Sequence, residues 1–71
     1  MRAVLIDALE KQYEAEIASA DAAIKLLLEN SVAVSDHLNH QKELDCLLHK
    51  IATAEEKIQL LKDYEIPKGE L

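Results

Sequence analysis

The sequence predicts an all-α protein, an antiparallel hairpin of two helices with coiled-coil-like packing. Two segments of nearly equal length carry apolar residues spaced three or four residues apart, which places them on one helix face. They flank a short stretch, residues 30–36, whose composition does not continue either pattern. We expect one domain, residues 1–64, built from a helix at about 3–29, a turn at about 30–36 and a helix at about 37–64, followed by a flexible tail at 65–71.

The predicted first helix has two contrasting faces. Its apolar face is the expected seam with the second helix and comprises Ile6, Leu9, Tyr13, Ile17, Ala20, Ile24 and Leu27. The opposite face carries the residues that we call the alanine strip: Ala8, Ala15, Ala18, Ala22 and Leu26. Alanine there has two explanations, because it is the best helix former and because small residues let another helix approach closely. Under the second explanation, the alanine strip is the surface on which a partner protein docks.

The predicted second helix has a more regular seam. Its apolar positions alternate between three and four residues apart, and charged residues flank them as at the edges of a coiled coil: Leu44, Leu47, Ile51, Ala54, Ile58 and Leu61. His40 falls one step before Leu44 in the same register. Ala54 is small enough to accommodate a bulky partner such as Tyr13 or Ile17. We therefore expect coiled-coil packing between the two helices.

The two segment boundaries carry residues that suit helix ends. Asn30 is suited to the left-handed position that ends a helix, and Ser35 or Asp36 is suited to an N-cap. Near the C-terminus, Pro67 prevents the second helix from continuing. These residues support a turn in the middle of the chain and a non-helical tail.

Composition and charge exclude several classes of function. The formal net charge is -6, with lysines scattered among acids, so binding to a nucleic-acid backbone is not expected. No apolar run approaches the roughly 20 residues needed to span a bilayer. Cys46 is the only cysteine, which excludes an internal disulfide and favours a reducing cytoplasm. A 71-residue hairpin with one seam has little core, so we expect it to pair as a homodimer in a four-helix bundle.

One group of side chains has metal-ligand chemistry. The spacing is His-x2-His followed by Cys-x2-His: His37, His40, Cys46 and His49. On one continuous helix, Cys46 and His49 point in a different direction around the helix axis from His37 and His40. Four ligands therefore converge only if the helix breaks or two chains contribute. We expect no metal and no cofactor, and we interpret these residues as polar positions near the loop end of the helix. With no predicted pocket and no glycine-rich phosphate loop, we also expect no enzymatic activity.

Three short motifs resemble a group of small helical-hairpin proteins of T-even-type tailed bacteriophages, such as the one encoded beside the helicase UvsW. The motifs lie in residues 13–18 (Tyr-Glu-Ala-Glu-Ile-Ala), 32–37 (Val-x-Val-Ser-Asp-His) and 51–58 (Ile-Ala-x-Ala-Glu-Glu-Lys-Ile). The resemblance covers roughly residues 5–64. It implies an accessory role in phage DNA metabolism, exercised through protein partners in the host cytoplasm.

The sequence thus predicts a non-enzymatic protein–protein interaction or assembly module. Two alternatives stay open. A directly nucleic-acid-binding accessory protein would show salt-dependent binding to DNA. A metal-responsive regulator that uses the His and Cys side chains would show zinc-dependent thermal stability.

Overall fold

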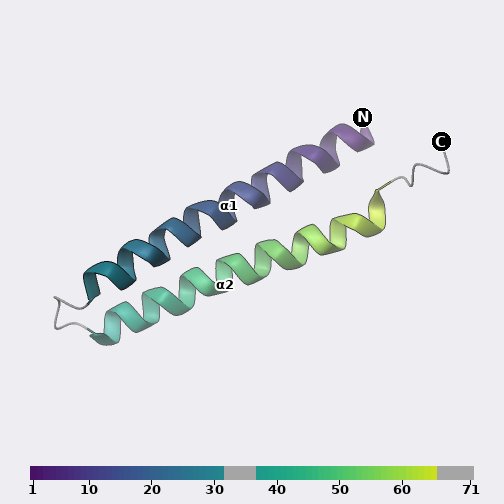
Figure 1. Ribbon diagram of the computed structural model, residues 1–71. Coiled ribbons are helices and arrows are strands. Elements are labelled where there is room, and N and C mark those ends of the chain that lie inside the picture. The colour runs from purple at the N-terminus through teal and green to yellow at the C-terminus, as the bar shows by residue number, and fades with distance from the viewer. Residues whose placement is uncertain (32–36, 66–71) are drawn as a thin grey trace.

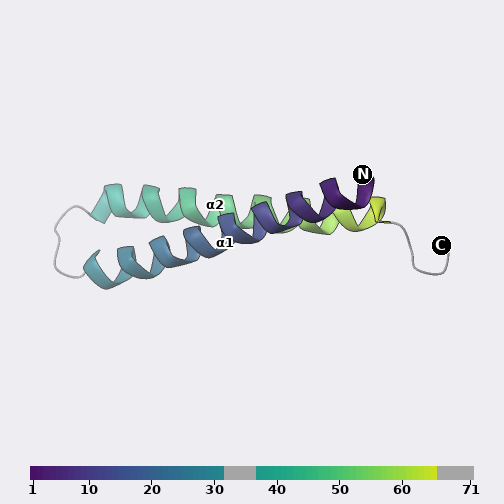
Figure 2. The same cartoon turned by 90° about the horizontal axis from the view of Figure 1, so that it is seen from above.

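The computed structural model describes residues 1–31 and 37–65, with the backbone alone at Ser31 and His37. Helix α1 spans Arg2–Ser31, helix α2 spans His37–Leu61, and a short 3-10 turn, η1, spans Lys62–Tyr64. The two long helices lie side by side and run antiparallel, so that the N-terminus is beside the end of α2 (Figure 1). The turned view shows that they cross at a shallow inclination (Figure 2). Within the described residues, the prediction of an all-α helical hairpin is confirmed.

The first turn of α1 begins at the chain end. The N–H of Leu5 donates a hydrogen bond of 3.0 Å to the carbonyl oxygen of Met1, which therefore precedes the helix as its first acceptor. Neither long helix has an acidic residue in its first turn or a basic residue in its last. Within residues 2–31 and 37–61, no such charge therefore offsets either helix dipole. Most helical stability in proteins comes from the packing of an apolar face, which here is the seam.

The helix ends differ in detail from the sequence pattern. Helix α1 continues through Asn30 to Ser31, so Asn30 is helical and does not occupy a left-handed capping position. Asn and Ser inside a helix cost only a few tenths of a kcal/mol relative to Ala, which is too little to force an earlier end. Helix α2 tightens into η1 after Leu61 and stops at Glu65, whose backbone is extended at φ -73° and ψ 143°. The predicted turn residues 32–36 and the tail residues 66–71 lie outside the described residues.

The buried and half-buried side chains of the hairpin lie along the single contact between its two helices. Ala20 and Ala54 are the buried hydrophobic residues of the described chain, with 4% and 1% of their surface exposed. Half-buried residues continue this line along both helices, and their spacing alternates four and three without a break: Ile6, Glu10, Tyr13, Ile17, Ile24 and Leu27 on α1, and His40, Leu44, Leu47, Ile51, Ile58 and Leu61 on α2. This is the spacing of a coiled-coil interface. No large side chain of the described residues is fully buried.

Candidate interaction surfaces

The predicted seam residues lie along the contact line between the helices, with one exception. Leu9 is 38% exposed, whereas the neighbouring Glu10 is half-buried. The reason is the register of the seam, whose positions alternate three and four residues apart. Because Ile17 and Tyr13 are four apart, the next step back is three, to Glu10, and the one after is four, to Ile6. The apolar character of Leu9 predicts a seam position, which the register of the helix does not give it. The regular spacing of the later seam positions was the signal that could have identified Glu10.

Tyr13 and Lys57 form a contact between the helices. The Nζ of Lys57 lies over the Tyr13 ring, 5.4 Å from the ring centroid. Tyr13 is half-buried in the seam, and Lys57 is exposed at its edge. The ring therefore covers part of the seam with its apolar body and offers its electron-rich face to a cation at the rim.

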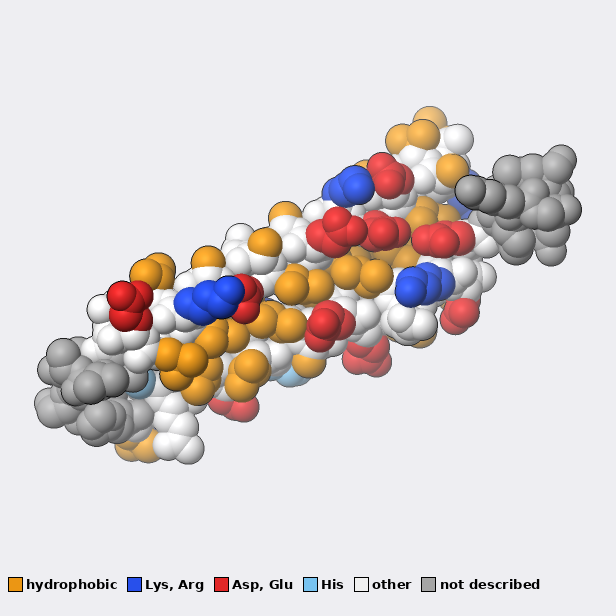
Figure 3. Space-filling view, in the orientation of Figure 1, with side chains coloured by type: hydrophobic (Ala, Val, Ile, Leu, Met, Phe, Trp, Pro, Cys, Tyr) orange, Lys and Arg blue, Asp and Glu red, His pale blue; other side chains and the backbone are white. Residues whose placement is uncertain are grey.

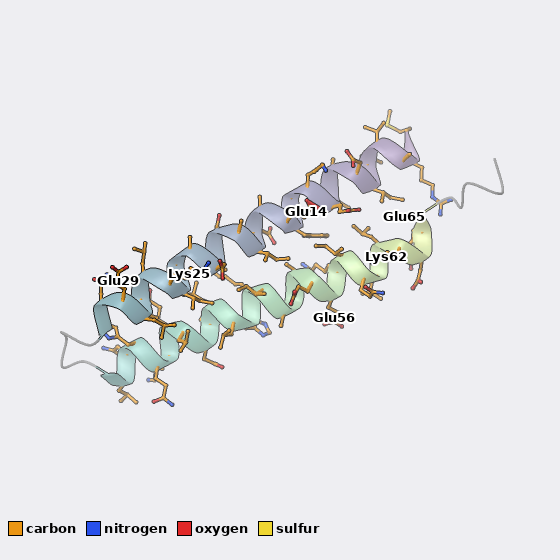
Figure 4. The ribbon with its side chains drawn as sticks, in the orientation of Figure 1. Glu14, Lys25, Glu29, Glu56, Lys62 and Glu65 are labelled. Atoms are coloured by element: carbon orange, nitrogen blue, oxygen red, sulfur yellow. The ribbon has the colours of Figure 1, made fainter. Side chains whose placement is uncertain are left out.

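One long side of the hairpin is strongly charged. Figure 3 shows acidic and basic side chains spread over both helices, and an apolar band between the helices in the half near the end of α1. In the same orientation, Figure 4 labels Glu14 and Lys25 on α1 and Lys62 at the start of η1. We call this the charged side. Lys25 and Asp21 form an ion pair of 2.9 Å on it, and this hydrogen bond with Asp21, together with the carboxylate charge, raises the pKa of Lys25.

The other flank of the seam is hollowed. An open groove of about 500 Å³ is lined by side chains of both helices, and we call it the small-residue groove: Gln12, Ala15, Glu16, Ser19, Ala20, Ala23, Leu47 and Lys50. Its deepest residue is Ala20, while Gln12, Ala15 and Ser19 are exposed. Small side chains on α1 leave this space because nothing larger than serine projects from residues 15, 19, 20 and 23.

A second hollow continues the groove along the same flank. It measures about 400 Å³ and is lined by Glu16, His49, Lys50, Thr53 and Ala54. Glu16 and Lys50 line both hollows and lie on opposite helices. Glu16 accepts a hydrogen bond of 3.4 Å from the Nε2 of Gln12. The one ion pair within the described residues joins Asp21 to Lys25. Glu16 and Lys50 therefore line the same hollow without forming an ion pair with each other.

The alanine strip does not coincide with this groove. All five of its residues are exposed in the hairpin, and only Ala15 also lines the groove. Ala22, one heptad later, lies outside both hollows. The groove itself was not predicted, because it depends on where the second helix lies against the first.

The His and Cys side chains do not converge in the part of the chain that the structure describes. No three His, Cys, Asp or Glu side chains there are close enough to hold a metal ion. His49 is exposed, with its Nε2 3.5 Å from the Oγ1 of Thr53, and Cys46 is exposed as well. His40 is half-buried, and its Nδ1 is buried without a hydrogen-bond partner. The side chain of His37 lies outside the described residues.

Neither α1 nor α2, as far as the structure describes them, is long and apolar enough to cross a membrane. Comparison with known proteins finds no matching protein-family model, no matching curated protein and no matching solved structure.

Proposed function

We propose that the chain is a non-enzymatic interaction module that assembles as a homodimer, two hairpins forming a four-helix bundle. The observation that supports this proposal is the mismatch between apolar content and burial. Ten large hydrophobic residues of the described chain are exposed, Leu5, Leu26 and Leu38 among them at 58%, 59% and 65%. Among the residues whose side chains the structure describes, Ala20 and Ala54 are the only buried ones. A second hairpin is the simplest way to remove this apolar surface from water.

The overall dimensions support the same proposal. The chain exposes 5719 Å², whereas a compact folded protein of 8.0 kDa exposes about 4500 Å². Its radius of gyration is 16.7 Å, compared with about 11 Å for a compact domain of this length. The excess surface exceeds the roughly 800 Å² that each partner contributes to a standard protein–protein interface.

The polar groups of the hollows favour binding over catalysis. His49 and Thr53 are one helical turn apart on an exposed face, which is the ordinary neighbour relationship of a helix. A nucleophile and base would also need an orienting group and donors for a developing charge, and no further described group is bonded to the His49 ring. Exposed side chains such as Gln12, Glu16 and Lys50 border the hollows, which thus resemble a docking surface more than an enclosed substrate site.

Sedimentation equilibrium tests the proposal. We expect a dimer at micromolar concentrations and a melting temperature that rises with protein concentration, because association stabilises the folded state by mass action. A monomer at high micromolar concentration, with melting independent of concentration, would overturn the proposal. The sequence resemblance to phage hairpin proteins is what supports placing such an assembly among accessory proteins of phage DNA metabolism.

A further inference from the structure

We infer that the second copy docks on the small-residue groove in one particular orientation. The twofold axis runs parallel to the long axis of the hairpin, so that α1 of each copy covers α2 of the other. Glu16 of each copy then lies opposite Lys50 of the other copy. This inference rests on the proposed homodimer and adds the surface and the geometry by which it forms.

The charge distribution selects the groove flank. At about 100° per residue, two sets of positions lie on opposite flanks of the α1 seam. On the groove flank, one of seven positions is charged: Leu5, Leu9, Gln12, Glu16, Ser19, Ala23 and Leu26. On the charged side, five of seven are charged: Asp7, Lys11, Glu14, Ala18, Asp21, Lys25 and Leu28. On α1, burying the first set desolvates far fewer charges than burying the second, and interface centres are depleted in charged residues.

Shape and area agree with this choice. The floor of the groove is Ala20, and the exposed walls at Ala15 and Ser19 are short. Short side chains at the middle of a contact let two helices approach closely. A helix of 30 residues is about 45 Å long, and two helices side by side are about 20 Å wide. Such a face supplies on the order of the 800 Å² per partner that a stable interface needs.

Charge complementarity then selects the orientation. Glu16 and Lys50 lie near the middle of the hairpin, on different helices, and are not ion-paired to each other within it. An axis along the hairpin brings α1 over the partner's α2, which pairs each Glu16 with a Lys50 and does so twice by symmetry. An axis across the hairpin brings α1 over α1, which opposes Glu16 to Glu16 and is unfavourable.

Reversing the two charges separately and then mixing the variants tests this geometry. We expect Glu16→Lys and Lys50→Glu each to weaken self-association by about tenfold or more, because each homodimer then has two like-charge contacts. An equimolar mixture of the two should form a heterodimer, in which both contacts again join opposite charges. Sedimentation velocity with a fluorescent label on the N-terminus of one variant measures this directly. An effect within a single hairpin cannot produce such rescue.

Two matched controls accompany these variants. Glu14→Lys makes the same charge change on the charged side, from another exposed glutamate of the same helix. Ala15→Glu and Ala22→Glu are identical changes one heptad apart, of which only the first enters the groove. We expect Glu14→Lys and Ala22→Glu to dimerise like the wild type, and Ala15→Glu to dimerise at least about tenfold more weakly.

Each outcome has a distinct meaning. A wild-type chain that stays monomeric overturns the homodimer proposal and this inference with it. A dimeric wild type without heterodimer rescue overturns the inference and leaves the homodimer standing. Weakening by Glu14→Lys, with Glu16→Lys unaffected, would place the interface on the charged side instead.

Discussion

The Nζ of Lys57 on α2 lies 5.4 Å from the centroid of the Tyr13 ring on α1 and so joins the two helices at the edge of their seam. Replacing Lys57 with Met keeps the aliphatic stem and removes the cation. We expect this change to lower the free energy of unfolding by about 0.5–1 kcal/mol, the usual size of an exposed cation–π contact.

A double-mutant cycle with Tyr13→Leu isolates that contact, because the ring provides the only face for the cation. Urea unfolding at one fixed protein concentration is the measurement. Tyr13→Phe serves as the control and should retain the coupling, since its ring also has an electron-rich face. A coupling energy of zero would show that the contact between Lys57 and Tyr13 contributes nothing to stability.

The two most buried residues are alanines, and enlarging them should therefore destabilise the hairpin. Ala54 is 1% exposed, so Ala54→Leu must push the helices apart or distort its neighbours. We expect a loss of about 1–3 kcal/mol in the free energy of unfolding. The matched control is Ala52→Leu at an exposed position of the same helix, which should change it by less than about 0.5 kcal/mol. Equal behaviour of the two variants would contradict close packing at Ala54.

A charge in the seam should abolish folding. Ile51 is half-buried in the middle of α2, and an aspartate there would lose solvation without gaining a partner. We expect Ile51→Asp to lose most of its helical circular dichroism at 25 °C. Ile51→Val keeps an apolar side chain and should cost only about 0.5–1.5 kcal/mol. Retention of helicity and cooperative melting by Ile51→Asp would show that the seam does not hold the hairpin together.

The Asp21–Lys25 pair should contribute a small stabilisation that is lost at high pH. Asp21 raises the pKa of Lys25 above its ordinary value of 10.5. The resulting stabilisation is fully present below that ordinary value and is lost as the pH rises through the higher folded-state pKa. Both side chains are mostly exposed, at 76% for Lys25 and 51% for Asp21, so the contribution is small.

Comparison with Asp21→Asn isolates this pair from the other lysines. The small stability difference between the wild type and the variant should stay constant from neutral pH to about pH 10 and vanish in stronger alkali. Urea unfolding of both proteins over this range is the measurement. A difference that persists after Lys25 has lost its proton would have to come from something other than this ion pair.

The sequence by itself determined that the chain makes two helices and which faces they turn toward each other. The reason is local, because a spacing of three and four residues places side chains such as Ile17, Ile24 and Leu27 on one face of the first helix whatever that helix packs against. The same arithmetic could have identified Glu10 as a seam residue. Helix boundaries were less determined by the sequence, since Asn30 is compatible with both a helix interior and a helix end.

Only the tertiary structure decided which surfaces remain after the helices meet. Whether Ala15 borders a groove while Ala22 does not depends on the position of Leu47 and Lys50 across the seam, and no pattern within one helix contains that information. The pairing of Tyr13 with Lys57 likewise depends on the relative register of two segments 44 residues apart in the sequence. Local periodicity determines which face of each helix is apolar, whereas register and crossing between the helices determine which side chains from different helices line the same hollow.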